Sequence, residues 1–363
     1  MLSELIAAAG RKALITGLVA IVTTVATIAL RATSAGDIAV FIASAAALAS
    51  LASVVGEATD QLGARLGPGA TGVVQSALGN LPELFISIFA LRAGLVVVVQ
   101  TALIGSILAN SLLVLGLAFA VGGLRHGRQR FGTETTRMTA MLLVLSVASL
   151  AIPTLATAPG APDFGHARDL SIVTAVVLLV VFLGSIPMAV RGDIGPARTK
   201  HEGATGWSLA ASVIVLAAAG LGAAFVSDWF VEALKPAMAS LALSEEFVGL
   251  VIVAIAGNAV ENVVGITAAA RNEADLAVSL ILNSSLQIAL LLIPALVLMS
   301  IFLGGPMLTL IAPPLLIASL GLAAILGALI VFDGESNYVE GLALIGLYII
   351  IAGSVWFGPP LAP

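Results

Sequence analysis

The stretch Gly79-Asn-Leu-Pro-Glu-Leu-Phe-Ile-Ser-Ile-Phe-Ala-Leu-Arg-Ala-Gly94 places Glu83 inside an apolar run. A second stretch, Gly257-Asn-Ala-Val-Glu-Asn-Val-Val-Gly-Ile-Thr-Ala-Ala-Ala-Arg-Asn272, repeats the pattern Gly-Asn-x-x-Glu and ends it at Glu261. A carboxylate at the centre of a membrane helix costs at least about 2.5 kcal/mol on insertion scales, and such residues are usually functional. The two stretches therefore predict an internal repeat and, within it, a functional site.

The composition of the whole chain indicates a membrane protein. Of the 363 residues, 60% are hydrophobic and 10% are charged, and the mean hydropathy is +1.15. Soluble domains carry about 25% charged residues, so the bilayer is the expected solvent. The absence of cysteine excludes disulfides, thiolate metal sites and thiol catalysis. The basic residues form no patch of the kind that nucleic acid requires, and we expect no nucleic-acid partner.

Apolar windows of about 20 residues, the length that crosses a bilayer, predict an all-α polytopic fold. The eleven candidate spans lie near residues 13–30, 37–59, 69–91, 95–122, 138–158, 170–190, 207–228, 247–270, 275–303, 306–332 and 338–357. We interpret the first as an uncleaved span rather than a signal peptide, because its apolar run is longer than the usual signal core.

The basic residues predict the orientation of these spans, because cytoplasmic loops are enriched in Lys and Arg. With a cytoplasmic N-terminus, the predicted outer side holds only four of the fifteen basic residues: Arg31, Arg92, Arg168 and Lys235. We therefore expect a multi-pass protein of the cell membrane with its N-terminus in the cytoplasm and its C-terminus outside.

The same alternation makes the two motifs antiparallel, because the third predicted span runs outward and the eighth runs inward. We expect an additional N-terminal transmembrane helix at 1–31 and a first five-helix repeat at 32–190. A cytoplasmic linker at 191–206 then leads to a second, inverted five-helix repeat at 207–363. Inverted repeats place corresponding segments near the bilayer midplane, where transported substrates bind.

Around the two glutamates the polar residues offer oxygen atoms only. Each motif places its Asn three residues before its Glu, on the same face of a helix. Gly79, Pro82 and Gly257 weaken their helices and are expected to free backbone carbonyl oxygens. The candidate supporting ligands are Asn80, Asn258, Ser106, Asn110, Asn283, Ser284 and Gln287.

Several of these residues have an alternative interpretation, because Ser and Asn in membrane helices often hold neighbouring helices together. For Ser106, Asn110, Ser111, Ser284 and Ser285 we give this interpretation the same weight as a ligand role. Glycines in membrane helices more often permit close helix contact than bind a ligand, and we expect this of Gly105 and Gly116.

The chemistry of two glutamates with amide oxygens suits a hard cation. Ca²⁺ takes six to eight oxygen ligands, and two carboxylates neutralise one divalent ion. Without the ion, carboxylates in a low dielectric favour the protonated form. Competition between a cation and protons for one site is the minimum requirement for antiport. We therefore predict a secondary transporter in which Glu83 and Glu261 bind the cation or protons, with no cofactor.

Two further acids, Glu57 and Glu232, lie near the ends of the second and seventh predicted spans. We interpret them as candidate access-route acids that concentrate cations at the two mouths of the site. Ordinary solvated carboxylates at the membrane interface are the alternative.

The two quoted stretches resemble the signature repeats of the calcium/cation antiporter superfamily, and the similarity is greatest to its cation/proton exchanger branch. Gly105-Ser-Ile-Leu-Ala-Asn110 and Ser284-Ser-Leu-Gln-Ile-Ala289 match the elements that follow the two motifs. The resemblance implies a plan of one plus five plus five spans, with a Ca²⁺ site made by Glu83 and Glu261. It also implies export of Ca²⁺ driven by inward movement of protons.

The sequence departs from the pattern of that branch in three respects, at two positions and in one segment. Asn262 stands where a His usually follows the second motif's Glu, and Asn283 replaces a Gly. The acidic segment usual between the halves is reduced to 191–206.

Other functions remain open at the level of sequence. Na⁺, K⁺ or Mn²⁺ in place of Ca²⁺ would need the same oxygen ligands, and a passive cation channel would also place acids in the membrane. An intramembrane enzyme with two catalytic acids normally uses a pair of Asp residues, and we do not expect an enzyme here.

Overall fold

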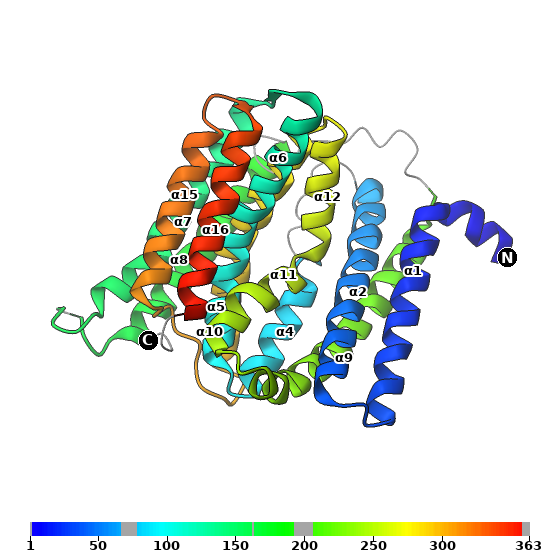
Figure 1. Cartoon of the computed structure of the whole chain (residues 1–363), viewed down its shortest axis with the longest axis horizontal. Coiled ribbons are helices and arrows are strands. Elements are labelled where there is room, and N and C mark those ends of the chain that lie inside the picture. The colour runs from blue at the N-terminus through cyan, green and yellow to red at the C-terminus, as the bar shows by residue number, and fades with distance from the viewer. Residues whose placement is uncertain (1, 67–77, 162, 192–205, 358–363) are drawn as a thin grey trace. The chain divides into compact units, whose positions relative to one another are not determined.

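The computed structural model describes residues 2–66, 78–161, 163–191 and 206–357, and helices dominate it (Figure 1). The chain forms two compact units, each of which draws on both halves of the sequence. The first unit consists of Met1–Ala93, Thr199–Leu243 and Ala256–Val260. The second unit consists of Gly94–Arg198, Ser244–Ile255 and Glu261–Pro363.

Among the described residues, the long helices of the first unit are α1 (Leu2–Ala32), α2 (Asp37–Leu66), α4 (Leu81–Arg92) and α9 (Leu209–Leu241). Helix α1 packs on α2, and both α2 and α4 pack on α9. The hydroxyl groups of Thr23 and Ser50 join α1 to α2 at 2.8 Å, while the rings of Phe41 and Phe230 stack between α2 and α9 with centroids 4.9 Å apart. Small residues along these helices let the backbones approach closely. In lipid, where no hydrophobic effect drives helices together, such close packing stabilises their association.

The second unit contains the remaining elements. Its α-helices are α5 (Val96–Leu108), α6 (Leu115–His126), α7 (Thr133–Ala156), α8 (Ala167–Arg191), α10 (Glu245–Phe247), α13 (Ala274–Gln287), α14 (Ile293–Ser300), α15 (Pro314–Ile330) and α16 (Tyr338–Phe357). Three π-helical turns, η1 (Ala109–Val114), η2 (Val248–Val253) and η3 (Ile288–Leu292), and two short strands, β1 (Gln129–Arg130) and β2 (Glu335–Ser336), complete it. Helices α11 (Ala254–Gly257) and α12 (Ala259–Ala270) each begin in one unit and end in the other.

Glycines set the closest helix contacts of the second unit. A Cβ atom on Gly116 of α6 would lie 2.7 Å from the carbonyl oxygen of Gly341 on α16. A Cβ atom on Gly105 of α5 would lie 2.7 Å from the Cα atom of Leu250 in η2. The prediction that Gly105 and Gly116 permit close helix contact is confirmed.

The prediction of an all-α polytopic fold is confirmed. Among the described residues, eight helices are long and apolar enough to cross a membrane, and a ninth span results if the bent pair Glu245–Gly257 and Ala259–Ala270 counts as one. The third predicted span begins within residues 67–77, which lie outside the described residues, and only its second part is seen as α4. The number eleven therefore stays a prediction.

The tenth predicted span, 306–332, is helical only from Pro314 onward. Residues 301–313, here called the strap, form no regular helix between α14 and α15. Pro306 and Pro313 lack the backbone donor that a helix needs, and the residue before each proline is driven out of the helical conformation. The expectation of one continuous helix is wrong in this part.

Side chains from four helices satisfy the backbone of the strap. They are Gln100 of α5, Thr154 of α7, Ser171 of α8 and Ser300 of α14. Irregular backbone within a membrane protein is tolerated where the surrounding protein supplies such partners. The strap is therefore fixed by specific polar contacts with the helices around it.

Replacing Thr154 with valine is expected to destabilise the second unit. The Thr154 hydroxyl donates to the carbonyl oxygen of Leu310 at 2.9 Å and accepts from the backbone N–H of Ala312 at 3.0 Å. Valine leaves both groups without these partners, at a cost of about 1–3 kcal/mol for each. Thermal unfolding of the purified protein in detergent measures the loss.

Thr139 provides the matched control on the same helix. Its hydroxyl is buried and bonds only to the carbonyl oxygen of Thr135 within α7. The Thr139→Val variant should melt close to the wild type. Equal melting temperatures for Thr154→Val and Thr139→Val would contradict the role of the strap contacts.

The seventh predicted span is longer than expected. Helix α9 continues without interruption from Leu209 to Leu241 and contains Pro236. The sequence prediction ended the span at 228 because the stretch 229–246 is amphipathic rather than wholly apolar. Glu232 therefore lies within a helix rather than at the end of one.

Candidate functional site

The first Gly-Asn-x-x-Glu motif lies at the start of a helix. Gly79 and Asn80 form a turn, and α4 begins at Leu81 with Pro82 as its second residue. Proline is well tolerated there because the first backbone N–H groups of a helix have no intrahelical acceptor. Glu83 consequently lies in the first turn of α4.

The second motif lies at an equivalent break. Helix α11 ends at Gly257 and α12 begins at Ala259, with a bend of 63° across Asn258. Glu261 lies in the first turn of α12, as Glu83 lies in the first turn of α4. The expected weakening of the helices at both motifs is confirmed, and a break of this kind frees backbone carbonyl groups for other partners.

Within the first unit, Gly257 of the second motif meets Glu83 of the first. A Cβ atom on Gly257 would lie 3.0 Å from the Cγ atom and 3.3 Å from the Oε1 atom of Glu83. The glycine of the second motif thus lies directly against the glutamate of the first. Glu83 is 7% exposed, and the motif amides Asn80 and Asn258 are 6% and 0% exposed. A buried carboxylate, with buried amides in the same two motifs, is an environment that a hard cation can use.

Within the second unit, the segments that follow the two motifs also meet. The amide Nδ2 of Asn110 donates to the Ser284 hydroxyl at 3.0 Å, and the hydroxyls of Ser111 and Ser285 lie 3.3 Å apart. All four side chains are buried. These bonds join α13 to η1, so the interpretation of these residues as contacts between helices is confirmed for the four of them.

Two π-helical turns begin next to these contacts. Turn η1 starts at Ala109, immediately before Asn110, and η3 starts immediately after Gln287. A π-helical turn contains one extra residue per turn and is found frequently at functional sites, where it redirects side chains and carbonyl groups. No sequence signal predicted these turns.

The other candidate ligands are placed as follows. Ser106 is 4% exposed and Gln287 is 9% exposed, while Asn283 is half-buried. Glu261 is half-buried. Asn262, at the position where the antiporter branch usually has a His, is 9% exposed, and its Oδ1 atom accepts no hydrogen bond within the described structure.

The two candidate access-route acids lie in the first unit. Glu57 on α2 is half-buried, and its Oε1 atom accepts a hydrogen bond from Gln61 at 3.2 Å. Glu232 on α9 is exposed and forms an ion pair with Arg31 of α1 at 2.7 Å, and the same guanidinium lies 5.2 Å above the ring of Trp229. Glu232 therefore has a structural partner that sequence analysis did not identify.

The site is chemically an oxygen site. Among the described residues, no group of three or more His, Cys, Asp or Glu side chains gathers to hold a metal ion. Beside the motif glutamate of either unit, the polar groups that a cation could use are amide, hydroxyl and carbonyl oxygens, which suit hard ions such as Ca²⁺ rather than Zn²⁺. Such a set of oxygen ligands suits a cation that binds and dissociates rather than one that is held permanently.

A polytopic helical bundle with repeated, broken helices and a buried or half-buried acid at each break is the architecture of a secondary cation transporter. The sodium/calcium exchanger protein family matches residues 36–190 and 211–357, and the chain belongs to this family.

Two antiporters and one solved structure are similar to this chain over most of its length. The chain is 36% identical over 312 residues to the Ca²⁺/H⁺ antiporter ChaA of Bacillus subtilis, a match that covers 84% of this chain and 88% of that protein. It is 33% identical over 350 residues to a Ca²⁺/H⁺ antiporter of Synechocystis sp., covering 90% and 93%. The solved structure of native YfkE superposes with a TM-score of 0.80 at 30% identity and covers 94% of this chain and 100% of that one.

Proposed function

We propose that the protein is a Ca²⁺/H⁺ antiporter that works by alternating access, with Glu83 and Glu261 as the residues that bind Ca²⁺ or protons in turn. One observation carries the proposal: both motifs lie at helix breaks, and Gly257 of the second lies against the buried Glu83 of the first. A buried, doubly ionised and empty site is costly to carry through an occluded state. Either the cation or protons must therefore accompany each conformational change.

The comparisons support this substrate pair. The two relatives from Bacillus subtilis and Synechocystis sp. are both named Ca²⁺/H⁺ antiporters, and each match covers more than four fifths of both chains. The family match falls in two stretches separated by residues 191–210, which supports two repeats of about five spans with a linker at 191–206. Membership of a transporter family supports a protein without enzymatic activity.

Buried amides and hydroxyls are proposed to complete the oxygen set. Asn80, Asn258, Ser106 and Gln287 have side chains that are at least nine-tenths buried and carry oxygen atoms. Asn110 and Ser284 already bond to one another, so we propose that they orient the helices that carry the ligands. Asn283 remains a proposed outer ligand, and Glu57 and Glu232 remain proposed access-route acids.

The proposed orientation places the N-terminus in the cytoplasm and the C-terminus outside the cell membrane. Its support is the excess of basic residues on one predicted side. In the second unit, the turn after α6, the turn after α12 and the turn before α16 are joined by hydrogen bonds and ion pairs, as the predicted alternation of spans requires. These three turns are all expected in the cytoplasm.

Proteoliposomes that contain the purified protein and a pH-sensitive dye test the function. Addition of Ca²⁺ to one side is expected to drive protons in the opposite direction, with saturation as the Ca²⁺ concentration rises. Parallel additions of Mn²⁺, Na⁺ and K⁺ define the cation preference, and Ca²⁺ should give the largest signal. The carboxylate and amide ligands favour a divalent ion because two glutamates neutralise two charges.

The same assay separates exchange from its alternatives. A channel would pass Ca²⁺ without opposed proton movement and would respond to membrane potential alone. Proton movement driven by Na⁺ or K⁺ but not by Ca²⁺ would overturn the substrate assignment. Empty liposomes and liposomes with heat-denatured protein provide the baseline.

A further inference from the structure

The end of α12 away from Glu261 is held by side chains from another part of the second unit. Its backbone closes normally: Asn272 adopts a left-handed conformation with φ of +64°, and its N–H bonds to the carbonyl oxygen of Ala269 at 3.1 Å. This closure leaves the carbonyl group of Ala270 without a backbone donor. His126 Nε2, at the end of α6, lies 3.0 Å from that oxygen and donates to it.

Gln129 of β1 makes a second bond to the same helix end. Its Nε2 atom donates to the carbonyl oxygen of Ala269 at 3.2 Å, and the side chain is only 2% exposed. The amide fits against Gly122 of α6, where a Cβ atom would clash with all three terminal atoms of the Gln129 side chain. The side chain of Gln129 is therefore held in one position by the atoms around it.

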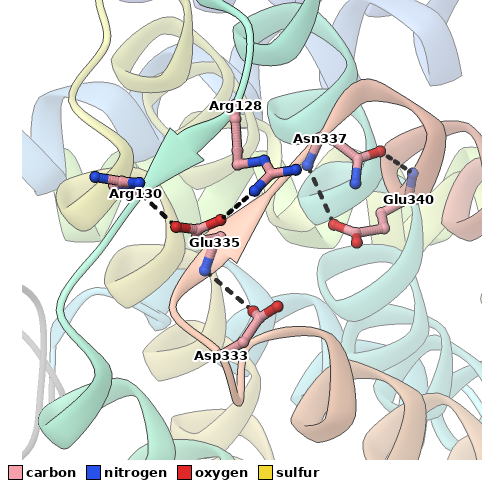
Figure 2. A network of polar contacts seen from close by, with 6 residues as sticks. All are labelled: Arg128, Arg130, Asp333, Glu335, Asn337 and Glu340. Carbon is pink, nitrogen blue, oxygen red and sulfur yellow. Dashed lines mark hydrogen bonds and ion pairs between the residues drawn. The ribbon is translucent and has the colours of Figure 1, made fainter.

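A polar network fixes the strand that carries Gln129 (Figure 2). Strand β1 pairs antiparallel with β2, and Arg128 and Arg130 both bond to Glu335, each at 3.0 Å. The N–H of Gly132 also bonds to the carboxylate of Asp275, in the first turn of α13. Glu335 and Asp275 already have protein partners, so this network fixes the position of β1 rather than forming a cation site.

Helix α4, which carries the other glutamate, is held in the same way within the first unit. Lys235 of α9 donates through Nζ to the carbonyl oxygen of Ala93, the residue that follows α4, at 2.9 Å. A cation at the C-terminal end of a helix is also favoured by the helix dipole. Helices α4 and α12 both have twelve residues, a glutamate in the first turn and a side-chain donor bonded to the backbone at the C-terminal end.

We propose that Gln129 and Lys235 are positioning residues. They fix the axial position and the rotation of α12 and α4, and so set the positions of Glu261 and Glu83. Each helix begins at a break, so its first turn lacks continuous helical support from the preceding segment. A slip by one residue would move a glutamate by about 1.5 Å along the axis and turn it by about 100°. The proposal rests on the function proposed above, in which these glutamates bind Ca²⁺.

The test compares Gln129→Met and Lys235→Met with the wild type in the proteoliposome assay. Both substitutions remove the donor: methionine has the length of glutamine and is one atom shorter than lysine. If fewer molecules of a variant have the helix in the binding-competent position, the apparent affinity for Ca²⁺ falls in proportion to the fraction that remains in it. A hydrogen bond contributes about 0.5–1.5 kcal/mol, so the Ca²⁺ concentration for half-maximal exchange should rise about two- to tenfold.

Two further variants provide the controls. Gln100 donates to the carbonyl oxygen of Thr309 at 2.9 Å, and it belongs to the strap contacts rather than to a motif helix. Gln100→Met should leave half-saturation unchanged. Lys235→Arg retains a donor and a charge and should restore the wild-type value. Lys235 is exposed, so its substitution is compatible with folding.

Each outcome is decisive. A rise in half-saturation for Gln129→Met and Lys235→Met, with none for Gln100→Met, supports the proposal. Wild-type half-saturation in both variants, or an equal rise in Gln100→Met, overturns it, as does a loss limited to thermal stability. Failure of the wild type to exchange Ca²⁺ for protons would instead overturn the proposed function.

Discussion

Replacing Glu83 or Glu261 with glutamine is expected to abolish Ca²⁺-driven proton movement. Glutamine has nearly the shape of glutamate, but it carries no charge to neutralise Ca²⁺ and cannot take up a transported proton. Loss of one charge from a buried ionic site costs about 3–5 kcal/mol, which corresponds to more than about 100-fold in affinity. The measurement is the initial rate of proton movement at saturating Ca²⁺ in proteoliposomes.

Glu134 provides the matched control. It is an exposed glutamate in the first turn of α7, so Glu134→Gln makes the same chemical change at the start of another helix. That variant should retain wild-type exchange. Thermal unfolding of all three variants establishes that they are folded. If Glu83→Gln and Glu261→Gln both exchange at the wild-type rate, the proposed mechanism is wrong.

Replacing Gly105 with alanine is expected to prevent stable folding of the second unit. Its missing Cβ atom would lie 2.7 Å from the Cα atom and 2.8 Å from the carbonyl carbon of Leu250, and it would also meet the carbonyl oxygen of that residue. Backbone atoms cannot rotate away as a side chain can. Gly249, on the same η2 turn, lies equally close to Val98 and Thr101 of α5, so the two segments interlock.

The expected cost of this overpacking is at least about 3 kcal/mol, the upper part of the usual range. The yield of monodisperse protein in detergent and its melting temperature measure it. Gly321→Ala is the control, because Gly321 lies within α15 and has no atom within 4 Å of its missing Cβ. A folded, wild-type-like Gly105→Ala variant would show that α5 and η2 do not cross as closely as described.

Sequence reasoning was strongest where one residue type has few uses in a membrane. The glutamates of the two motifs are such residues, because burial of a carboxylate without function is costly. Gly79, Pro82 and Gly257 also predicted the helix breaks, because their effect on the backbone is local. The family match covers both motifs.

Sequence reasoning was weakest where polarity alone decided the end of an element. The tenth span was predicted as one helix because hydropathy does not distinguish a helix from a strap whose backbone is satisfied by Gln100, Thr154, Ser171 and Ser300. The seventh span was ended at 228 because the stretch 229–246 is amphipathic, whereas helix α9 continues to Leu241. The ion pair of Glu232 with Arg31 joins residues that lie far apart in the chain.

By itself, the sequence determined the class of the protein and the two motifs, and it predicted an oxygen-only set of candidate ligands, because composition, spacing and residue type are local properties. Only the tertiary structure decided that Gly257 lies against Glu83, that Asn110 bonds to Ser284, and that Gln129 and Lys235 hold the ends of α12 and α4. Such contacts join residues far apart along the chain. No local pattern encodes them, because they depend on how whole helices pack.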